Sequence, residues 1–410
     1  MFIYQVLPRL WGKGKFSDWN DDSFDYVKSL GITHIWFTGI PRHATGAPFV
    51  KGDPGSPYSV KDWFDTNPYL ADKPEDRISE FESLVGRTHA AGLKVITDFI
   101  PNHVSPDYNG DIPRFDWCDY DWTDTRKVDW SDPATGAYML EVLRFWASKG
   151  VDGFRCDMVE LVPLQALSTL FSAIRKEFPE LVFIGEVYNT DNYRPFVQAG
   201  FDLLYDKSGL YDAMQLVLSG SPVSLLTQNW QRLQDLQPRM LNFLENHDEI
   251  RMQRPDFASL AFAAAFNKAS FMLYFGEELG ENASQESNRR TSIFDLRQPS
   301  CIKRLCSDIR QETSLTEEEA SILRRHRELL SAASQVHDWS NYDLCWCNAP
   351  GPFPFLRYSN GSCILFVCNF SDNQINTTIS IPEDARRLCG TQEEAIPVRV
   401  EPHDCCMISC

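Results

Sequence analysis

The sequence predicts an α/β protein, namely a (β/α)8 TIM barrel with a short inserted domain after its third strand and a C-terminal antiparallel β-sandwich. Three observations predict this fold class. Strand-like and helix-like segments alternate up to about residue 335, one long polar segment interrupts them, and short strands without helices follow from about residue 337. Eight alternating β–α units are typical of a closed barrel of parallel strands. We therefore expect a (β/α)8 barrel at 1–336, an inserted subdomain at 105–132 within it and a sandwich at 337–410.

Eight short apolar segments are the candidate barrel strands. They are Phe2–Val6, His34–Phe37, Val95–Phe99, Gly153–Asp157, Val182–Glu186, Asp202–Tyr205, Leu241–Leu244 and Phe271–Phe275. Continuous apolar runs of this length are consistent with strands that are buried on both faces. A doubly wound open sheet is the competing architecture, but Gly12 and Gly14 lack the spacing of its phosphate-binding loop. The closed barrel is therefore favoured.

Two helical segments carry clear start signals. In 74–91, apolar residues recur at helical spacing, and Pro74 suits a first helical turn. Thr316 followed by Glu319 is a capping box, which predicts a charged helix through Leu330.

Two regions depart from the barrel pattern. The segment from Ser105 to Asp132 is rich in Asp, Trp and Tyr, and it is too long for an ordinary connection, so we expect a functional excursion there. Near the C-terminus, the candidate strands of the sandwich are Phe355–Tyr358, Cys363–Asn369, Thr377–Ile381 and Val398–Val400.

Composition narrows the classes of partner. A formal net charge of −18 argues against nucleic acid and favours a neutral or cationic ligand. No apolar run approaches membrane-spanning length, so we expect no membrane partner, and no secretory signal is visible. The 12 Cys show no metal-ligand spacing, which favours reduced thiols in a cytoplasmic protein. A secreted protein with a trimmed signal stays open, and so does the oligomeric state.

Acidic residues stand at the ends of several candidate strands. Arg155 and Asp157 lie two residues apart, so their side chains point to the same face of a strand, where the guanidinium would hold the carboxylate ionised. Other candidate strands end near Asp98, Glu186 and Asp248. Because a barrel brings the C-terminal ends of its strands together, we expect these carboxylates to form one cluster.

A cluster of three carboxylates with flanking His and Arg suits cleavage of a glycosidic bond. One carboxylate attacks the sugar carbon, a second protonates the leaving oxygen, and a third steadies the positive charge of the transition state. Each residue alone also has a simpler explanation. Asp157 could form a structural ion pair with Arg155, Glu186 could cap a turn, and His103 or His247 could be a core histidine.

Six motifs in order resemble the alpha-amylase family of retaining glycoside hydrolases, family 13. The motifs are Gly55–Val60 (GSPYSV), Asp98–His103 (DFIPNH), Gly153–Asp157 (GFRCD), Gly185–Val187 (GEV), Phe243–Asp248 (FLENHD) and Tyr274–Glu278 (YFGEE). The resemblance covers nearly the whole chain and is that of a small cytoplasmic-type member.

The resemblance implies a role for each matching residue. It makes Asp157 the nucleophile, Glu186 the acid/base and Asp248 the transition-state stabiliser. The residues that it places around the reacting sugar are Tyr58, His103, Arg155 and His247. Trp117 and Trp122, in the long polar segment, are candidate sugar platforms.

The chain also departs from the family. Many starch-cleaving relatives have a Lys-His pair where this chain has Glu160 and Leu161, which changes the acceptor side. The resemblance implies no cofactor for the chemistry. Relatives with large insertions bind a structural calcium, with an Asn that matches Asn102 as one ligand, whereas the inserted segment of this chain is short. The aspartates of 105–132 do not have the spacing of a calcium loop, and a solvated acidic loop is the competing explanation.

The sequence therefore predicts a retaining α-glycoside hydrolase acting on α-1,4-glucans or maltooligosaccharides through a covalent intermediate. A 4-α-glucanotransferase or other transglycosylase on the same substrates is the first alternative. A non-catalytic glucan-binding relative is the second, although such a chain would be expected to lack one of the three carboxylates.

Overall fold

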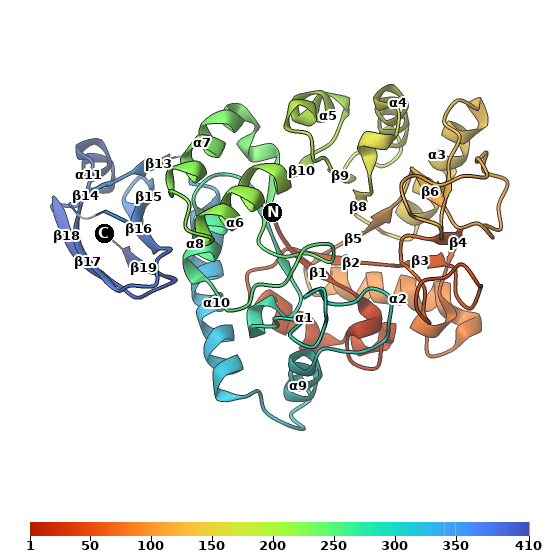
Figure 1. Cartoon of the computed structure of the whole chain (residues 1–410), viewed down its shortest axis with the longest axis horizontal. Helices are drawn as coiled ribbons and strands as arrows, with labels where there is room; N and C mark the ends of the chain where they lie inside the picture. Colours follow the sequence, from red (N-terminus) through yellow and green to blue (C-terminus); the bar gives the residue numbers. More distant parts are fainter. Residues whose placement is uncertain (340, 349, 410) are drawn as a thin grey trace.

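The computed structural model describes residues 1–339, 341–348 and 350–409. A closed barrel of eight parallel strands occupies most of the chain, and antiparallel sheets form its C-terminal part (Figure 1). Around the barrel the strands follow the order β1-β2-β5-β8-β9-β10-β11-β12, and β12 pairs with β1. The predicted fold class is confirmed.

All eight predicted barrel strands are present, and each end lies within one residue of the prediction. They are β1 (Phe2–Val6), β2 (His34–Phe37), β5 (Lys94–Phe99), β8 (Gly153–Cys156), β9 (Val182–Gly185), β10 (Leu203–Tyr205), β11 (Met240–Phe243) and β12 (Ser270–Tyr274).

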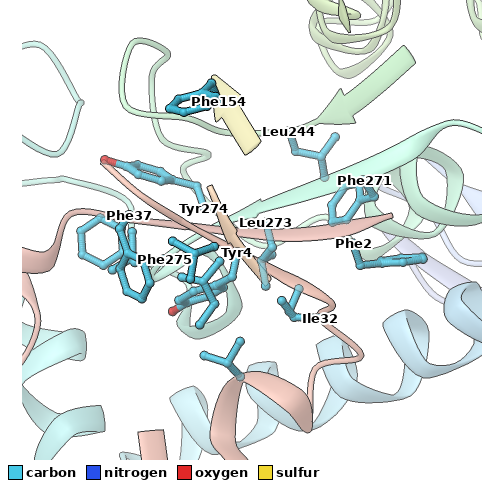
Figure 2. Packing of buried hydrophobic residues seen from close by; sticks show 14 of the residues in the cluster. Phe2, Tyr4, Ile32, Phe37, Phe154, Leu244, Phe271, Leu273, Tyr274 and Phe275 are labelled. Carbon is cyan, nitrogen blue, oxygen red and sulfur yellow. The ribbon is translucent and has the colours of Figure 1, made fainter. Parts of the chain in front are cut away.

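Alternation along each strand divides the barrel into two apolar layers. Side chains such as Ile3, Trp36 and Met272 point into the barrel and form one buried cluster. Their neighbours, such as Tyr4 and Leu273, point outward and form the layer between strands and helices, part of which Figure 2 shows. Because both faces are covered, the strands are mainly apolar, and polar residues such as Gln5, Asp98 and Arg155 lie toward their C-terminal ends.

Helices surround the barrel. They are α1 (Asp21–Lys28), α2 (Arg77–Ala90), α3 (Pro133–Ser148), α4 (Leu164–Ile174), α5 (Tyr193–Ala199), α6 (Asp212–Leu218), α7 (Ser224–Leu233), α8 (Phe257–Ala265), α9 (Ser300–Ile309) and α10 (Glu317–His337). The capping box of Thr316 and Glu319 is present at the start of α10, which runs seven residues beyond the predicted Leu330. A single 3-10 turn at Pro74–Asp76 precedes α2. None of the helices in the described ranges combines the length and apolar character that crossing a bilayer requires.

Two excursions rise from the C-terminal end of the barrel. In the first, which the sequence predicted, β6 (His103–Val104) pairs with β7 (Arg126–Lys127) and closes the base of the inserted segment. The second was not predicted: β3 (Pro41–His43) pairs with β4 (Val60–Thr66) after β2 and carries a long loop between them.

The C-terminal part is built from two antiparallel sheets, as predicted. One has the order β13 (Asn341–Leu344), β15 (Phe353–Ser359), β16 (Ser362–Asn369) and β19 (Asp404–Ser409), and the other β14 (Trp346–Cys347), β17 (Ile375–Ser380) and β18 (Ala395–Val400). Helix α11 (Glu383–Cys389) follows β17. Leu356 and Leu365 of the first sheet share a buried cluster with Ile379 and Val398 of the second. The exact domain limits stay predictions.

Candidate active site

One buried arginine contacts all three predicted catalytic carboxylates. Arg155, on β8, has no exposed surface. Its Nη1 lies 2.5 Å from Asp157 Oδ1, and its Nη2 lies 2.9 Å from Glu186 Oε1 and 3.9 Å from Asp248 Oδ2. The carboxylates follow strands β8, β9 and β11, so the closed barrel brings them into one group, as the sequence predicted.

Aromatic rings enclose the guanidinium on its other sides. It lies 5.4 Å from the ring of Trp36, 5.5 Å from that of Tyr58 and 5.4 Å from that of Tyr205, and its Nε donates to the Tyr205 hydroxyl. These ring faces favour a cation. Arg155 is thus a charge fixed by its surroundings, and it orients the carboxylates around it.

Glu186 is poised between its two protonation states. Its Oε1 accepts a hydrogen bond from the Tyr188 hydroxyl at 2.6 Å, and its Oε2 accepts one from the Met158 amide at 2.7 Å. Burial, together with the negative charges of Asp157 and Asp248, raises the pKa of Glu186 to about 7, although Arg155 and Tyr188 oppose the shift. A carboxyl with such a pKa can act as an acid and then as a base near neutral pH.

The turn after Asp157 supplies one of these donors. Met158 has a φ of 44°, in the left-handed region that residues other than glycine rarely adopt. Strained backbone of this kind is common at functional sites. Here the turned backbone directs the Met158 amide to Glu186.

Asp157 and Asp248 have different environments. Burial raises the pKa of Asp157 above its ordinary value, and the guanidinium of Arg155 opposes this shift. Burial also favours a higher pKa for Asp248, but two neighbouring groups outweigh this effect. His247, whose Nε2 lies 3.0 Å from Asp248 Oδ2, and Arg155 together lower the pKa of Asp248 to about 2. Asp248 therefore stays ionised while Glu186 can be protonated.

Tyr58 and His247 form a stacked pair beside the carboxylates. Their rings lie 5.0 Å apart at 13°, and the Tyr58 hydroxyl donates to Asp98 Oδ1 at 3.4 Å. Asp98 also accepts from Trp36 Nε1 and the Gly39 amide. Asp98 is therefore held among donors and positions Tyr58.

A pocket of about 680 Å³ opens above this group. Such a volume lies within the usual range of ligand pockets, about 300–1,000 Å³. The predicted residues that line it are Tyr58, His103, Asp157, Glu186, His247 and Asp248. The seventh, Arg155, is completely covered. Trp122 also lines the pocket, with its ring 5.4 Å from that of His103, whereas Trp117 does not line it and stacks on Phe115.

Several lining residues were not predicted. They are Lys51, Ser56, Tyr120, Asp121, Asp124, Thr125, Met158, Tyr188 and Phe294. Tyr188 has a sequence signal, because it stands two residues after Glu186 and alternation returns it to the same side. The others come from loops whose folding depends on distant parts of the chain.

The environment of Asn102 does not fit the predicted calcium ligand. Its Oδ1 accepts a hydrogen bond from the Lys127 ammonium, and its Nδ2 donates to Asp119 Oδ2 at 2.9 Å. The same ammonium lies 3.1 Å from Asp119 Oδ2 and donates to the Leu161 carbonyl at 3.1 Å. Lys127 thus holds the place of a cation among three oxygens. Within the described residues, no three His, Cys, Asp or Glu side chains are grouped to hold a metal ion.

Glu160, where the sequence departs from the family, holds the loop that carries Tyr188. Its carboxylate accepts from the amides of Tyr188 at 2.8 Å and Asn189 at 3.2 Å, and from Asn192 Nδ2 at 2.6 Å. The acidic residue at position 160, where many relatives have another residue, therefore anchors the loop beside Glu186.

Comparison with known proteins finds similar chains among amylases and related enzymes. Residues 18–112 match the model of the alpha-amylase catalytic domain. The chain is 24% identical over 309 residues to an intracellular maltogenic amylase of Bacillus subtilis strain 168, covering 65% of this chain and 49% of the relative. It is 24% identical over 439 residues to a cyclomaltodextrinase of Thermoanaerobacter pseudethanolicus, covering 91% of this chain and 70% of the relative.

Solved structures share the fold over the whole chain. An alpha-amylase from Lactobacillus plantarum superposes with a TM-score of 0.78 at 21% identity, covering 100% of this chain and 98% of the other. By contrast, this chain spans about half the length of several curated relatives that it matches. With the barrel, the carboxylate group and these matches together, the chain is similar to proteins of the alpha-amylase family.

Proposed function

We propose that this protein is a retaining α-glycoside hydrolase that acts on α-1,4-glucans or maltooligosaccharides. One observation carries the proposal: a single buried guanidinium lies against three carboxyl groups at a pocket, and one of the three has a pKa of about 7 while another stays ionised. A retaining mechanism requires one carboxyl group as acid and a second as nucleophile. The pKa of Glu186 suits the acid, and Asp157, held by the Arg155 guanidinium, is the proposed nucleophile.

In the proposed mechanism, Asp157 attacks the anomeric carbon while Glu186 gives its proton to the departing oxygen. A covalent bond forms between Asp157 and the sugar as the glycosidic bond breaks. Water then attacks the same carbon and gives a proton to Glu186, and Asp157 leaves as a carboxylate. Asp248 supports the positive charge that develops on the sugar ring. No cofactor takes part.

The proposed substrate class follows the named relatives, a maltogenic amylase and a cyclomaltodextrinase. The charge of −18 supports a neutral glucan rather than nucleic acid as the partner. A cytoplasmic location is part of the proposal and is supported by the intracellular maltogenic amylase among the relatives.

The proposal is tested by product analysis with maltotriose. Hydrolysis gives glucose and maltose alone, whereas longer products would mean that a second sugar replaces water, as in a glucanotransferase. We expect Glu186→Gln to lower kcat about 10²–10⁴-fold, the usual contribution of a general acid. Asp157→Asn should abolish turnover because no covalent intermediate can form.

Asp107→Asn is the matched control, since Asp107 pairs with Lys61 and does not line the pocket. Near-normal activity of the Asp157 or Glu186 variant would show that the assigned roles are wrong.

A further inference from the structure

Three loops that follow different strands reach one side of the pocket. They are the loop between β3 and β4 (44–59), the inserted segment between β6 and β7 (105–125), and the loop between β12 and α9 (275–299). Lys51 of the first loop, Asp124 of the inserted segment and Phe294 of the third loop line the pocket.

Two contacts join the first loop to the inserted segment. Lys51 Nζ lies 3.1 Å from Asp124 Oδ1, and the side chain of Asp124 is only 4% exposed. Ser59 Oγ donates to the backbone carbonyl of Asp124 at 2.5 Å. A partly exposed ion pair contributes little to stability. In this pair, however, the Asp124 carboxylate is buried, so it holds the Lys51 ammonium in place.

The first loop is also joined to the loop after β12. The backbone of Gly52 passes so close to Phe294 that a methyl group on Gly52 would collide with the Phe294 carbonyl oxygen, so only glycine fits. Arg9, which is buried, donates to the carbonyls of both Gly55 and Ile293. The three loops therefore form one joined wall, which we name the loop wall: 46–56, 119–125 and 290–297.

Most of the loop wall stands away from Glu186. Glu186 follows β9, and in the ring of eight strands β9 stands opposite β1. The loops that contain Lys51 and Phe294 follow β2 and β12, which flank β1. Tyr188 and Met158 line the pocket on the side of Glu186.

The position of the acid decides which part of the substrate faces the loop wall. In the proposed mechanism Glu186 protonates the leaving oxygen, so the released part of the chain extends past Glu186. The retained part, which carries the non-reducing end, then extends toward the loop wall.

We infer that the loop wall closes the glycone side of the pocket, so that the enzyme binds non-reducing chain ends and removes short saccharides from them. This inference rests on the proposed function. An internal segment of a long glucan would have to continue through the wall. Lys51 and Asp124 offer a donor and an acceptor at the wall, which suit the free hydroxyls of a terminal sugar.

The test compares p-nitrophenyl α-maltoheptaoside with the same compound carrying a 4,6-ethylidene group on its non-reducing sugar. All products are separated by chromatography. We expect the blocked compound to be cleaved at least about tenfold more slowly, because even one extra methylene group in a hydrophobic pocket is worth about 10–200-fold. Equal rates would overturn this inference and leave the proposed function intact. If neither compound is cleaved, the proposed function fails and this inference fails with it.

Opening the wall supplies a second readout. Lys51→Ala, alone and combined with Phe294→Ala, should raise the rate on the blocked compound relative to the unblocked one. Lys61→Ala is the matched control, because Lys61 pairs with Asp107 and does not line the pocket, so it should leave the ratio unchanged. An unchanged ratio in the double variant, with folding confirmed by circular dichroism, would contradict the loop wall as the cause of selectivity.

Discussion

At the scale of single residues, the two hydrogen-bond donors to Glu186 help to set the pKa of its carboxyl group, and with it the pH range in which Glu186 can act as an acid. The hydroxyl of Tyr188 and the amide of Met158 stabilise the carboxylate, whereas burial and the neighbouring carboxylates stabilise the protonated form. The balance brings the pKa to about 7. Tyr188 therefore acts through Glu186 and is a positioning residue.

Removing the Tyr188 hydroxyl should raise the pKa of Glu186, because the charged form loses a donor. Since Glu186 must be protonated for the first step, the alkaline limb of kcat/KM in Tyr188→Phe should move upward. A hydrogen bond to a charged group contributes about 1.5–3 kcal/mol and one pKa unit is about 1.4 kcal/mol, so we expect a shift of about one to two pH units. The measurement is the pH profile on a maltooligosaccharide.

Tyr138→Phe is the control for this change, because it removes a hydroxyl that is bonded to Tyr108 away from the pocket. An alkaline limb that stays in place in Tyr188→Phe would show that Tyr188 does not tune the acid.

At the scale of elements, Lys127 connects three segments. It extends from β7 to Asn102 after β5, to Asp119 in the inserted segment and to the Leu161 carbonyl after β8. Only 13% of its side chain is exposed. Its ammonium therefore fastens the inserted segment to the barrel beside the catalytic strand.

Because Lys127 already supplies the positive charge, the thermal midpoint of the protein should not change with EDTA or with added calcium. Lys127→Met should lower the stability by about 1–3 kcal/mol, since oxygens around it lose their donor. Differential scanning fluorimetry with and without EDTA checks both statements, and Lys61→Met is the control. A clear fall of the wild-type midpoint in EDTA would contradict this role of Lys127.

The accuracy of the sequence-based predictions differed between elements for a physical reason. The barrel strands are apolar on both faces, so composition alone located them. Strands β3 and β4 were not predicted. They contain Pro41, Asp62 and Asp65, and these residues interrupt the apolar pattern by which a strand is recognised in a sequence. Strand β19 was missed because its partly buried run Asp404–Ser409 shows no alternation.

At the scale of the whole molecule, Arg357 ties the sandwich to the barrel. It lies on β15 with no exposed surface, and it donates to the carbonyls of Ala265, Asn267, Val336 and Trp339. These carbonyls stand at the ends of α8 and α10. Although burial lowers the pKa of Arg357 to about 10, it remains charged near neutral pH.

Replacing this arginine should loosen the junction. Arg357→Met removes a donor from each of four carbonyls, and we expect a loss of about 2–4 kcal/mol in the free energy of unfolding, measured by urea titration. Arg399→Met, at a side chain that is 67% exposed, is the control and should change the stability little. A loss no larger than that of the control would show that Arg357 does not hold the two parts together.

The sequence by itself determined the barrel and the group of carboxylates, because both depend on local signals. Apolar runs mark strands, and polar residues directly after them, such as Asp157 and Glu186, must meet at one end of a closed barrel. Only the tertiary structure decided how Lys127 replaces the expected cation and how Lys51, Asp124 and Phe294 close one side of the pocket. Those contacts join loops far apart in the chain, and no local pattern of residues encodes which distant loop a side chain will contact.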